Sequence, residues 1–140
     1  MLKIKKISHI AIAVENIDEA LAKYERALGL TPTSREHVAS QKVEAALLPI
    51  GESSIELIAP AGNDGLKRFL ETRGPGLHHI AVEVEALEAA LTILKSLGVP
   101  LIDETPRVGA HGHKVAFLHP RATGGVLIEL IEPVTRHEHR

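Results

Sequence analysis

Residues 7–14 are largely apolar and β-branched, and a similar segment returns over residues 77–85. Such segments predict strands, in which successive side chains point to opposite faces. Each segment is followed by apolar residues at helical spacing, which predict helices over about 17–28 and 87–97. Further strands are predicted at 32–39, 42–49 and 53–59, and near 100–104, 113–119 and 125–132.

The two halves of the chain repeat one another at the level of sequence. Residues 9–15 match residues 79–85 at an offset of seventy, and residues 55–60 match residues 128–133. Several matches in the same order indicate an internal duplication rather than two independent strand–helix units of similar periodicity. The predicted organisation is a single domain over 1–140, with repeats 5–60 and 76–133, a linker helix at about 63–72 and a frayed tail at 134–140.

The order of elements defines the fold class. Each repeat is predicted to contain one strand, one helix and three further strands. The chain is therefore predicted to be an α+β protein of two tandem βαβββ modules. Together the modules are expected to form a cupped, mainly antiparallel sheet around a metal site. A length of 140 residues is sufficient to bury a core without crosslinks.

Composition excludes several classes of function and several kinds of metal ligand. The formal net charge of −2 argues against a general nucleic-acid binder. The chain contains no cysteine, so a metal would have to be bound by histidine nitrogens or carboxylate oxygens. No apolar run of eighteen residues and no stretch resembling a signal peptide occur, which excludes a predicted membrane span and favours the cytoplasm.

Alternation also predicts which side chains share a face. Ile10 and Ile12 fit a face packed on the helix, which places His9 on the opposite face, and the same pattern recurs around His79. In the last strand of each repeat, Glu56 and Glu129 are flanked by apolar residues and are likewise assigned to the inner face.

Two histidines and two carboxylates at repeat-equivalent positions predict a metal site. A buried carboxylate without a partner is costly, and one divalent cation satisfies all four groups. This donor set suits Co²⁺, Mn²⁺, Ni²⁺, Fe²⁺ or Zn²⁺. Among them Co²⁺ is the metal that we expect.

Several segments resemble the vicinal oxygen chelate superfamily, which includes glyoxalases, bleomycin resistance proteins and dioxygenases. Within it, the chain is similar to the methylmalonyl-CoA epimerase family, and the similarity spans nearly the whole chain. The segments that carry this resemblance are residues 7–11, 43–44, 58–60, 76–81, 117–120 and 125–130.

The resemblance implies a function and its residues. The metal ligands of the family fall on His9, Glu56, His79 and Glu129, and one family pattern has Gln where this chain has Glu56. The proton-transfer carboxylates fall on Glu44 and Glu129. The implied reaction interconverts (R)- and (S)-methylmalonyl-CoA through a metal-stabilised enolate, with an acyl-CoA thioester as substrate and a homodimer as the expected assembly.

Two further features are predicted to contribute to the site. Glu44 aligns with Val115 in the second half, so the repeat symmetry is broken there, which is typical of a functional position. The glycine-rich loop over residues 105–114 is expected to bind substrate by analogy, or to be a plain turn. The residues assigned to substrate binding in this loop are Arg107, Gly109, Gly112 and Lys114.

Three alternatives remain open from the sequence. A glyoxalase-type enzyme would use the same metal chemistry on a glutathione hemithioacetal. A ring-cleaving dioxygenase usually needs two histidines and one carboxylate on iron, and the additional Glu56 counts against it. A metal-free small-molecule binding protein of the same fold would typically lack the complete ligand set.

Overall fold

The structure, a computed structural model, describes residues 2–134 of the chain. These residues divide into two compact units. The first-half unit spans His9–His78, and the second-half unit combines the described residues up to Ser8 with those from His79 onward. The prediction of one domain over the whole chain is not tested by this division and stays a prediction.

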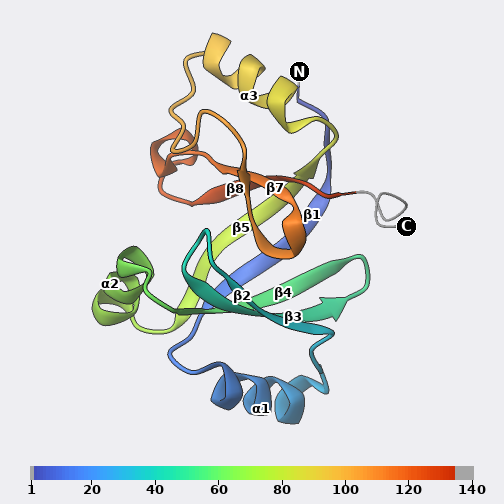
Figure 1. Ribbon diagram of the computed structural model, residues 1–140, viewed down its shortest axis with the longest axis vertical. Helices are drawn as coiled ribbons and strands as arrows, with labels where there is room; N and C mark the ends of the chain where they lie inside the picture. The colour runs from blue at the N-terminus through green and yellow to red at the C-terminus, as the bar shows by residue number, and fades with distance from the viewer. Residues whose placement is uncertain (1, 135–140) are drawn as a thin grey trace. The chain divides into compact units, whose positions relative to one another are not determined.

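The elements follow the predicted order. They are β1 (Ile4–Ala13), α1 (Ile17–Leu28), β2 (Ser34–Val38), β3 (Val43–Ile50), β4 (Ser53–Pro60), α2 (Asp64–Arg73), β5 (Gly76–Val84), α3 (Leu87–Ser96), β6 (Arg107–Val108), η1 (Ala110–Gly112), β7 (Lys114–Phe117), η2 (Pro120–Thr123) and β8 (Ile128–Glu132). Figure 1 shows these helices and strands along the chain.

In the first-half unit the strand order is β2-β3-β4-β1, with β1 parallel to β4 and the other two pairings antiparallel. Helix α1 begins after Asn16, whose side chain accepts a hydrogen bond from Glu19 N–H, and it ends at Gly29 in the left-handed conformation. Apolar residues of α1 and of the sheet share one core, in which Leu48 and Leu57 are fully buried. Helix α1 therefore packs on one face of this sheet and does not cover the opposite face.

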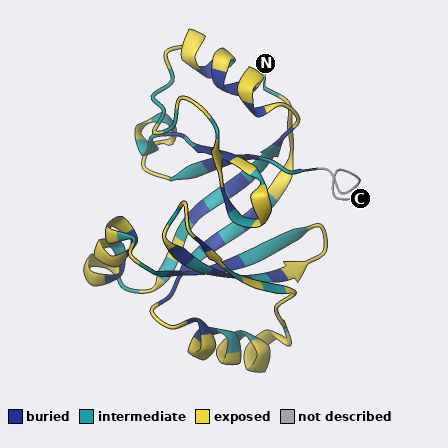
Figure 2. Cartoon of the chain, viewed as in Figure 1, coloured by how far each residue is buried: buried dark blue, intermediate teal, exposed yellow. Residues whose placement is uncertain are grey.

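The second-half unit repeats this plan with the strand order β5-β8-β7-β6. Strand β5 is parallel to β8, whereas β8 with β7 and β7 with β6 are antiparallel. Leu87, Leu91 and Leu130 belong to the core between α3 and this sheet. Figure 2 shows buried residues along the strands and along one side of α1 and of α3. The predicted α+β fold of two βαβββ modules, with mainly antiparallel pairing inside each, is confirmed.

The prediction of a strand at 100–104 is wrong. Only an isolated bridge between Leu101 and Leu118 forms there, and the edge strand is the two-residue β6 at Arg107–Val108. Pro100 has no N–H to donate to a ladder, and the side chain of Asp103 accepts the Phe117 N–H. The segment is therefore tied to β7 by irregular hydrogen bonds instead of a regular strand.

The linker helix is found as α2, capped by the Asn63 side chain on Leu66 N–H. The predicted frayed tail lies outside the described residues except for Val134. Among the described residues, no helix is long and apolar enough to cross a membrane.

Candidate metal centre

One histidine–carboxylate pair lies in the first-half unit. His9 is on β1 and Glu56 on β4, where the parallel register places Ala11 beside Glu56. The His9 Nε2 lies 3.5 Å from Glu56 Oε1. Each residue is only 7% exposed, and Ala11 and Ala13, on the same face as His9, are fully buried. Alternation thus puts both groups on the face that α1 does not cover.

The second-half unit contains the equivalent pair. His79 is on β5 and Glu129 on β8, and Ala81 is the register partner of Glu129. The His79 Nε2 lies 3.1 Å from Glu129 Oε1, and the two residues are 7% and 4% exposed. Ala81, Val115 and Ile131 form a small apolar cluster on this face. The register Ala81–Glu129 matches Ala11–Glu56, so the structure supports the duplication at the level of individual residues.

The four predicted ligands are also the buried polar or charged residues in the described part of the chain. Imidazole nitrogens and carboxylate oxygens are suitable ligands for a divalent transition metal. Burying two carboxylates is costly unless a cation or hydrogen bonds compensate for the lost hydration. The residues present therefore fit a divalent metal, and each pair presents one nitrogen and one carboxylate for it.

Glu44 lies in a different environment from the pairs. It is opposite Ala59 on β4 and His37 on β2, and its carboxylate lies 2.6 Å from His37 Nδ1. Ala59 belongs to the core under α1, and Arg35, two residues before His37, forms an ion pair with Asp18 of α1. Glu44 is therefore on the α1 side of the sheet, opposite to the face that carries Glu56.

The same register corrects the repeat counterpart of Glu44. Leu47 is opposite Glu56, and Phe117 is opposite Glu129, so Leu47 and Phe117 are equivalent. Counting three residues back from each makes Lys114 the counterpart of Glu44, and the predicted counterpart Val115 is wrong. The break in symmetry persists, since an acidic residue in one half stands where a basic residue stands in the other.

The predicted substrate loop is divided between two faces. Arg107 is opposite Val115 in the register, on the face that carries Glu129. Lys114 is opposite Glu132, and its Nζ lies 3.9 Å from Glu88 of α3, which places it on the helix side. Gly109 donates its N–H to His113 C=O, and Gly112 takes a positive φ, so both serve the turn around η1.

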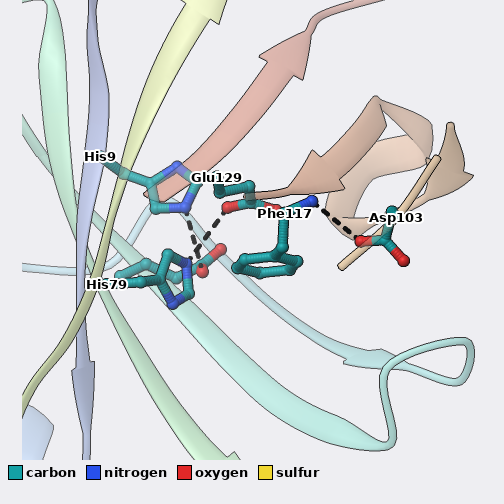
Figure 3. Close-up of polar contacts among 6 residues, drawn as sticks. His9, His79, Asp103, Phe117 and Glu129 are labelled. Atoms are coloured by element: carbon teal, nitrogen blue, oxygen red, sulfur yellow. Dashed lines mark hydrogen bonds and ion pairs between the residues drawn. The ribbon is translucent and has the colours of Figure 1, made fainter. Parts of the chain in front are cut away.

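Two residues beside the second pair were missed by the sequence analysis. The Phe117 ring meets the His79 ring edge-on, with centroids 5.2 Å apart, and Asp103 accepts the Phe117 N–H (Figure 3). Phe117 lies in segment 117–120, which carries the family resemblance, but its position opposite Glu129 follows only from the strand register. Asp103 lay in a segment that was predicted as a strand and gave no signal.

Comparison with known proteins defines the class. Residues 8–117 match the model of the Glyoxalase/Bleomycin resistance protein/Dioxygenase superfamily, and the chain belongs to this superfamily.

Individual relatives narrow the class to a family. The chain is 46% identical over 129 residues to the Bacillus subtilis protein YqjC, covering 91% of this chain and 92% of YqjC. It is 35% identical over 130 residues to an ethylmalonyl-CoA/methylmalonyl-CoA epimerase of Cereibacter sphaeroides, covering 91% and 97% of the two chains. A solved methylmalonyl-CoA epimerase in complex with methylmalonyl-CoA and NH4⁺ superposes with a TM-score of 0.90 at 30% identity, covering 95% and 97%. Within the superfamily, the chain is thus a member of the methylmalonyl-CoA epimerase family, a family of enzymes.

Proposed function

We propose that this protein is a metal-dependent epimerase that interconverts (R)- and (S)-methylmalonyl-CoA. The observation that carries the proposal is the pair of buried histidine–carboxylate sites, one in each half at equivalent register positions. Membership in the epimerase family supplies the reaction, and the solved relative with methylmalonyl-CoA supports an acyl-CoA thioester as the substrate class.

His9, Glu56, His79 and Glu129 are the proposed ligands of one divalent cation, each offering one nitrogen or oxygen atom. A bound divalent cation acts as a Lewis acid on carbonyl and carboxylate oxygens and thereby acidifies the carbon between them. Co²⁺ is the proposed metal, and Mn²⁺, Ni²⁺ and Zn²⁺ are suited to the same donors.

The protein's own part in the reaction is proton transfer at the carbon between the carboxylate and the thioester. One carboxylate removes this proton, so the C–H bond breaks, an O–H bond forms and an enolate is left. A second acidic group returns a proton to the opposite face of the planar carbon, which inverts its configuration. Glu129 is proposed as one of these groups in addition to its role as ligand. It is 4% exposed, so its carboxylate is shielded from bulk water.

The family resemblance assigns the second proton-transfer group to Glu44. The register counts against this assignment, because Glu44 lies on the α1 side of β3 with His37. Glu36 is the rival from geometry, since it is opposite Ala45 and shares the face of Glu56. Both residues are carboxylates of the same short hairpin, so each is the natural control for the other.

The function is tested by solvent deuterium exchange into methylmalonyl-CoA. Protein that has been stripped with a chelator and reloaded with Co²⁺ should incorporate deuterium at the α-carbon and racemise the substrate. Absence of exchange with every divalent metal listed above would reject the epimerase proposal.

The Glu44→Gln and Glu36→Gln variants identify the second proton-transfer group. The family assignment predicts that Glu44→Gln loses turnover by roughly 10²–10⁴-fold with unchanged metal content, while Glu36→Gln remains active. The reverse result assigns the second group to Glu36. Loss of metal in Glu44→Gln would mean that Glu44 is a ligand.

A glyoxalase-type activity is the second candidate, favoured by the superfamily match and by the same donor set. Assay of the glutathione hemithioacetal beside methylmalonyl-CoA separates the two reactions. A homodimer and a cytoplasmic location complete the proposal, and sedimentation of the purified protein tests the first of these.

A further inference from the structure

Asp103 uses both oxygens of its carboxylate inside the second-half unit. Its Oδ2 accepts the Phe117 N–H at 2.8 Å, and its Oδ1 lies 3.1 Å from Arg107 Nε. The side chain of Asp103 is only 13% exposed, whereas that of Arg107 is 41% exposed. A carboxylate in this position makes one charge-assisted bond to the backbone of a strand and one to a cation.

Phe117 is held at its backbone from both sides. Its N–H is bonded to the Asp103 carboxylate, and its C=O accepts the N–H groups of Ile102 at 2.9 Å and Asp103 at 3.2 Å. Phe117 is the last residue of β7, where the regular ladder ends. The segment around Asp103 therefore fixes the end of β7 where a neighbouring strand would otherwise do so.

The Phe117 ring contacts both Arg107, the other partner of Asp103, and His79, a proposed ligand. The His79 ring meets it edge-on at an interplanar angle of 85°, and the Arg107 guanidinium carbon is 5.8 Å from the ring centroid. Phe117 is also opposite Glu129 in the strand register. The ring thus contacts His79 and shares a sheet face with Glu129, as seen in Figure 3.

We propose that Asp103 is a positioning residue for the metal centre. By fixing Phe117 it holds the His79 imidazole in the orientation in which Nε2 faces Glu129, and by pairing with Arg107 it keeps that cation over the Phe117 ring. This role depends on the proposed function, because it requires that His79 binds the metal. Groups that orient a ligating imidazole typically affect metal affinity by 10–100-fold when they are removed.

The repeat supplies a variant for the test. Leu47 occupies in the first half the position that Phe117 occupies in the second, so leucine is compatible with this site of the module. Phe117→Leu removes the ring that links Asp103 to His79. Asp103→Ala removes the anchor, Asp103→Asn keeps an oxygen for the Phe117 N–H but loses the charge that holds Arg107, and Glu104→Gln is the control on the exposed neighbour.

The experiment measures Co²⁺ affinity by titration and the His79 ring resonances by NMR in the metal-free protein. Asp103→Ala and Phe117→Leu should each weaken Co²⁺ binding by about 10–100-fold and shift the His79 signals. The double variant should be little worse than either single variant, because both changes act through one path. Asp103→Asn should recover most of the affinity, and Glu104→Gln should match the wild type.

A purely structural role for Asp103 predicts a different outcome. Asp103→Ala would then lower the melting temperature while Co²⁺ affinity and the His79 resonances stay unchanged, and the proposal would be overturned. Additive losses in the double variant would overturn it as well. If Asp103→Ala does not fold, Phe117→Leu and Asp103→Asn still decide the question. None of these measurements uses methylmalonyl-CoA, so failure of the epimerase reaction is distinguishable from failure of this proposal.

Discussion

The two βαβββ modules place the same pair of side chains on the same strands, yet they surround the pair differently. In the first half, His9 and Glu56 lie among regular strands, with Leu47 opposite Glu56. In the second half, Phe117 is opposite Glu129, and its ring contacts His79. The strands that follow α3 are short and are joined by single turns of 3₁₀ helix. The duplication therefore preserves one histidine and one glutamate in each half, whereas the residues around them differ between the halves.

The largest expected difference between the halves concerns the two carboxylates. Glu129→Gln should lower turnover by roughly 10²–10⁴-fold, because the amide keeps one ligand oxygen but can no longer accept the substrate proton. Glu56→Gln keeps one ligand oxygen and matches the residue of one family pattern, so we expect activity to persist with an altered metal preference. Steady-state rates of both variants with Co²⁺, Mn²⁺ and Zn²⁺ measure this. Equal losses in the two variants would show that the halves contribute identically.

A smaller difference is expected at the helix starts. Helix α1 is capped locally by Asn16, whereas α3 begins after Ala86, which offers no side-chain cap, and the Leu87 N–H is bonded to Glu132 of β8 at 2.8 Å. Asn16→Ala should cost about 1 kcal/mol of stability. Glu132→Ala should cost about 1–3 kcal/mol, because it leaves a partly buried N–H without its charged acceptor. Urea unfolding of the two variants tests the order, and a larger loss for Asn16→Ala would contradict it.

The smallest effect is expected at the ion pair between Asp18 and Arg35. The hydrogen bond from Arg35 lowers the pKa of the exposed Asp18 carboxyl. A group with a lowered folded-state pKa stabilises the protein above its unfolded pKa, and this contribution is lost as pH falls through the folded value. The stability difference between wild type and Asp18→Asn should therefore shrink as the pH is lowered below about 4. A difference that is constant from pH 7 to pH 3 would show that the charge on Asp18 does not contribute.

Features that depend on residues close together in the chain could be predicted from the sequence, whereas features that depend on strand pairing could not. The helices, most strands and the inner-face placement of His9, Glu56, His79 and Glu129 follow from alternation and from the repeat, which are local patterns. The position of Glu44 was not predicted, because the face of a residue in β3 depends on the register with β4. A one-residue shift in the alignment of β7 made Val115 its apparent counterpart. Asp103 could not be identified because its partners, Phe117 and Arg107, are brought to it by irregular backbone that has no period.

The central claim is that one pair from each half binds a single divalent cation, and the stoichiometry of metal binding tests it most directly. Titration of chelator-treated protein with Co²⁺ should give one tight site per chain, and His9→Ala and His79→Ala should each abolish that site. Two independent sites per chain, or a tight site that survives the loss of either histidine, would contradict the account.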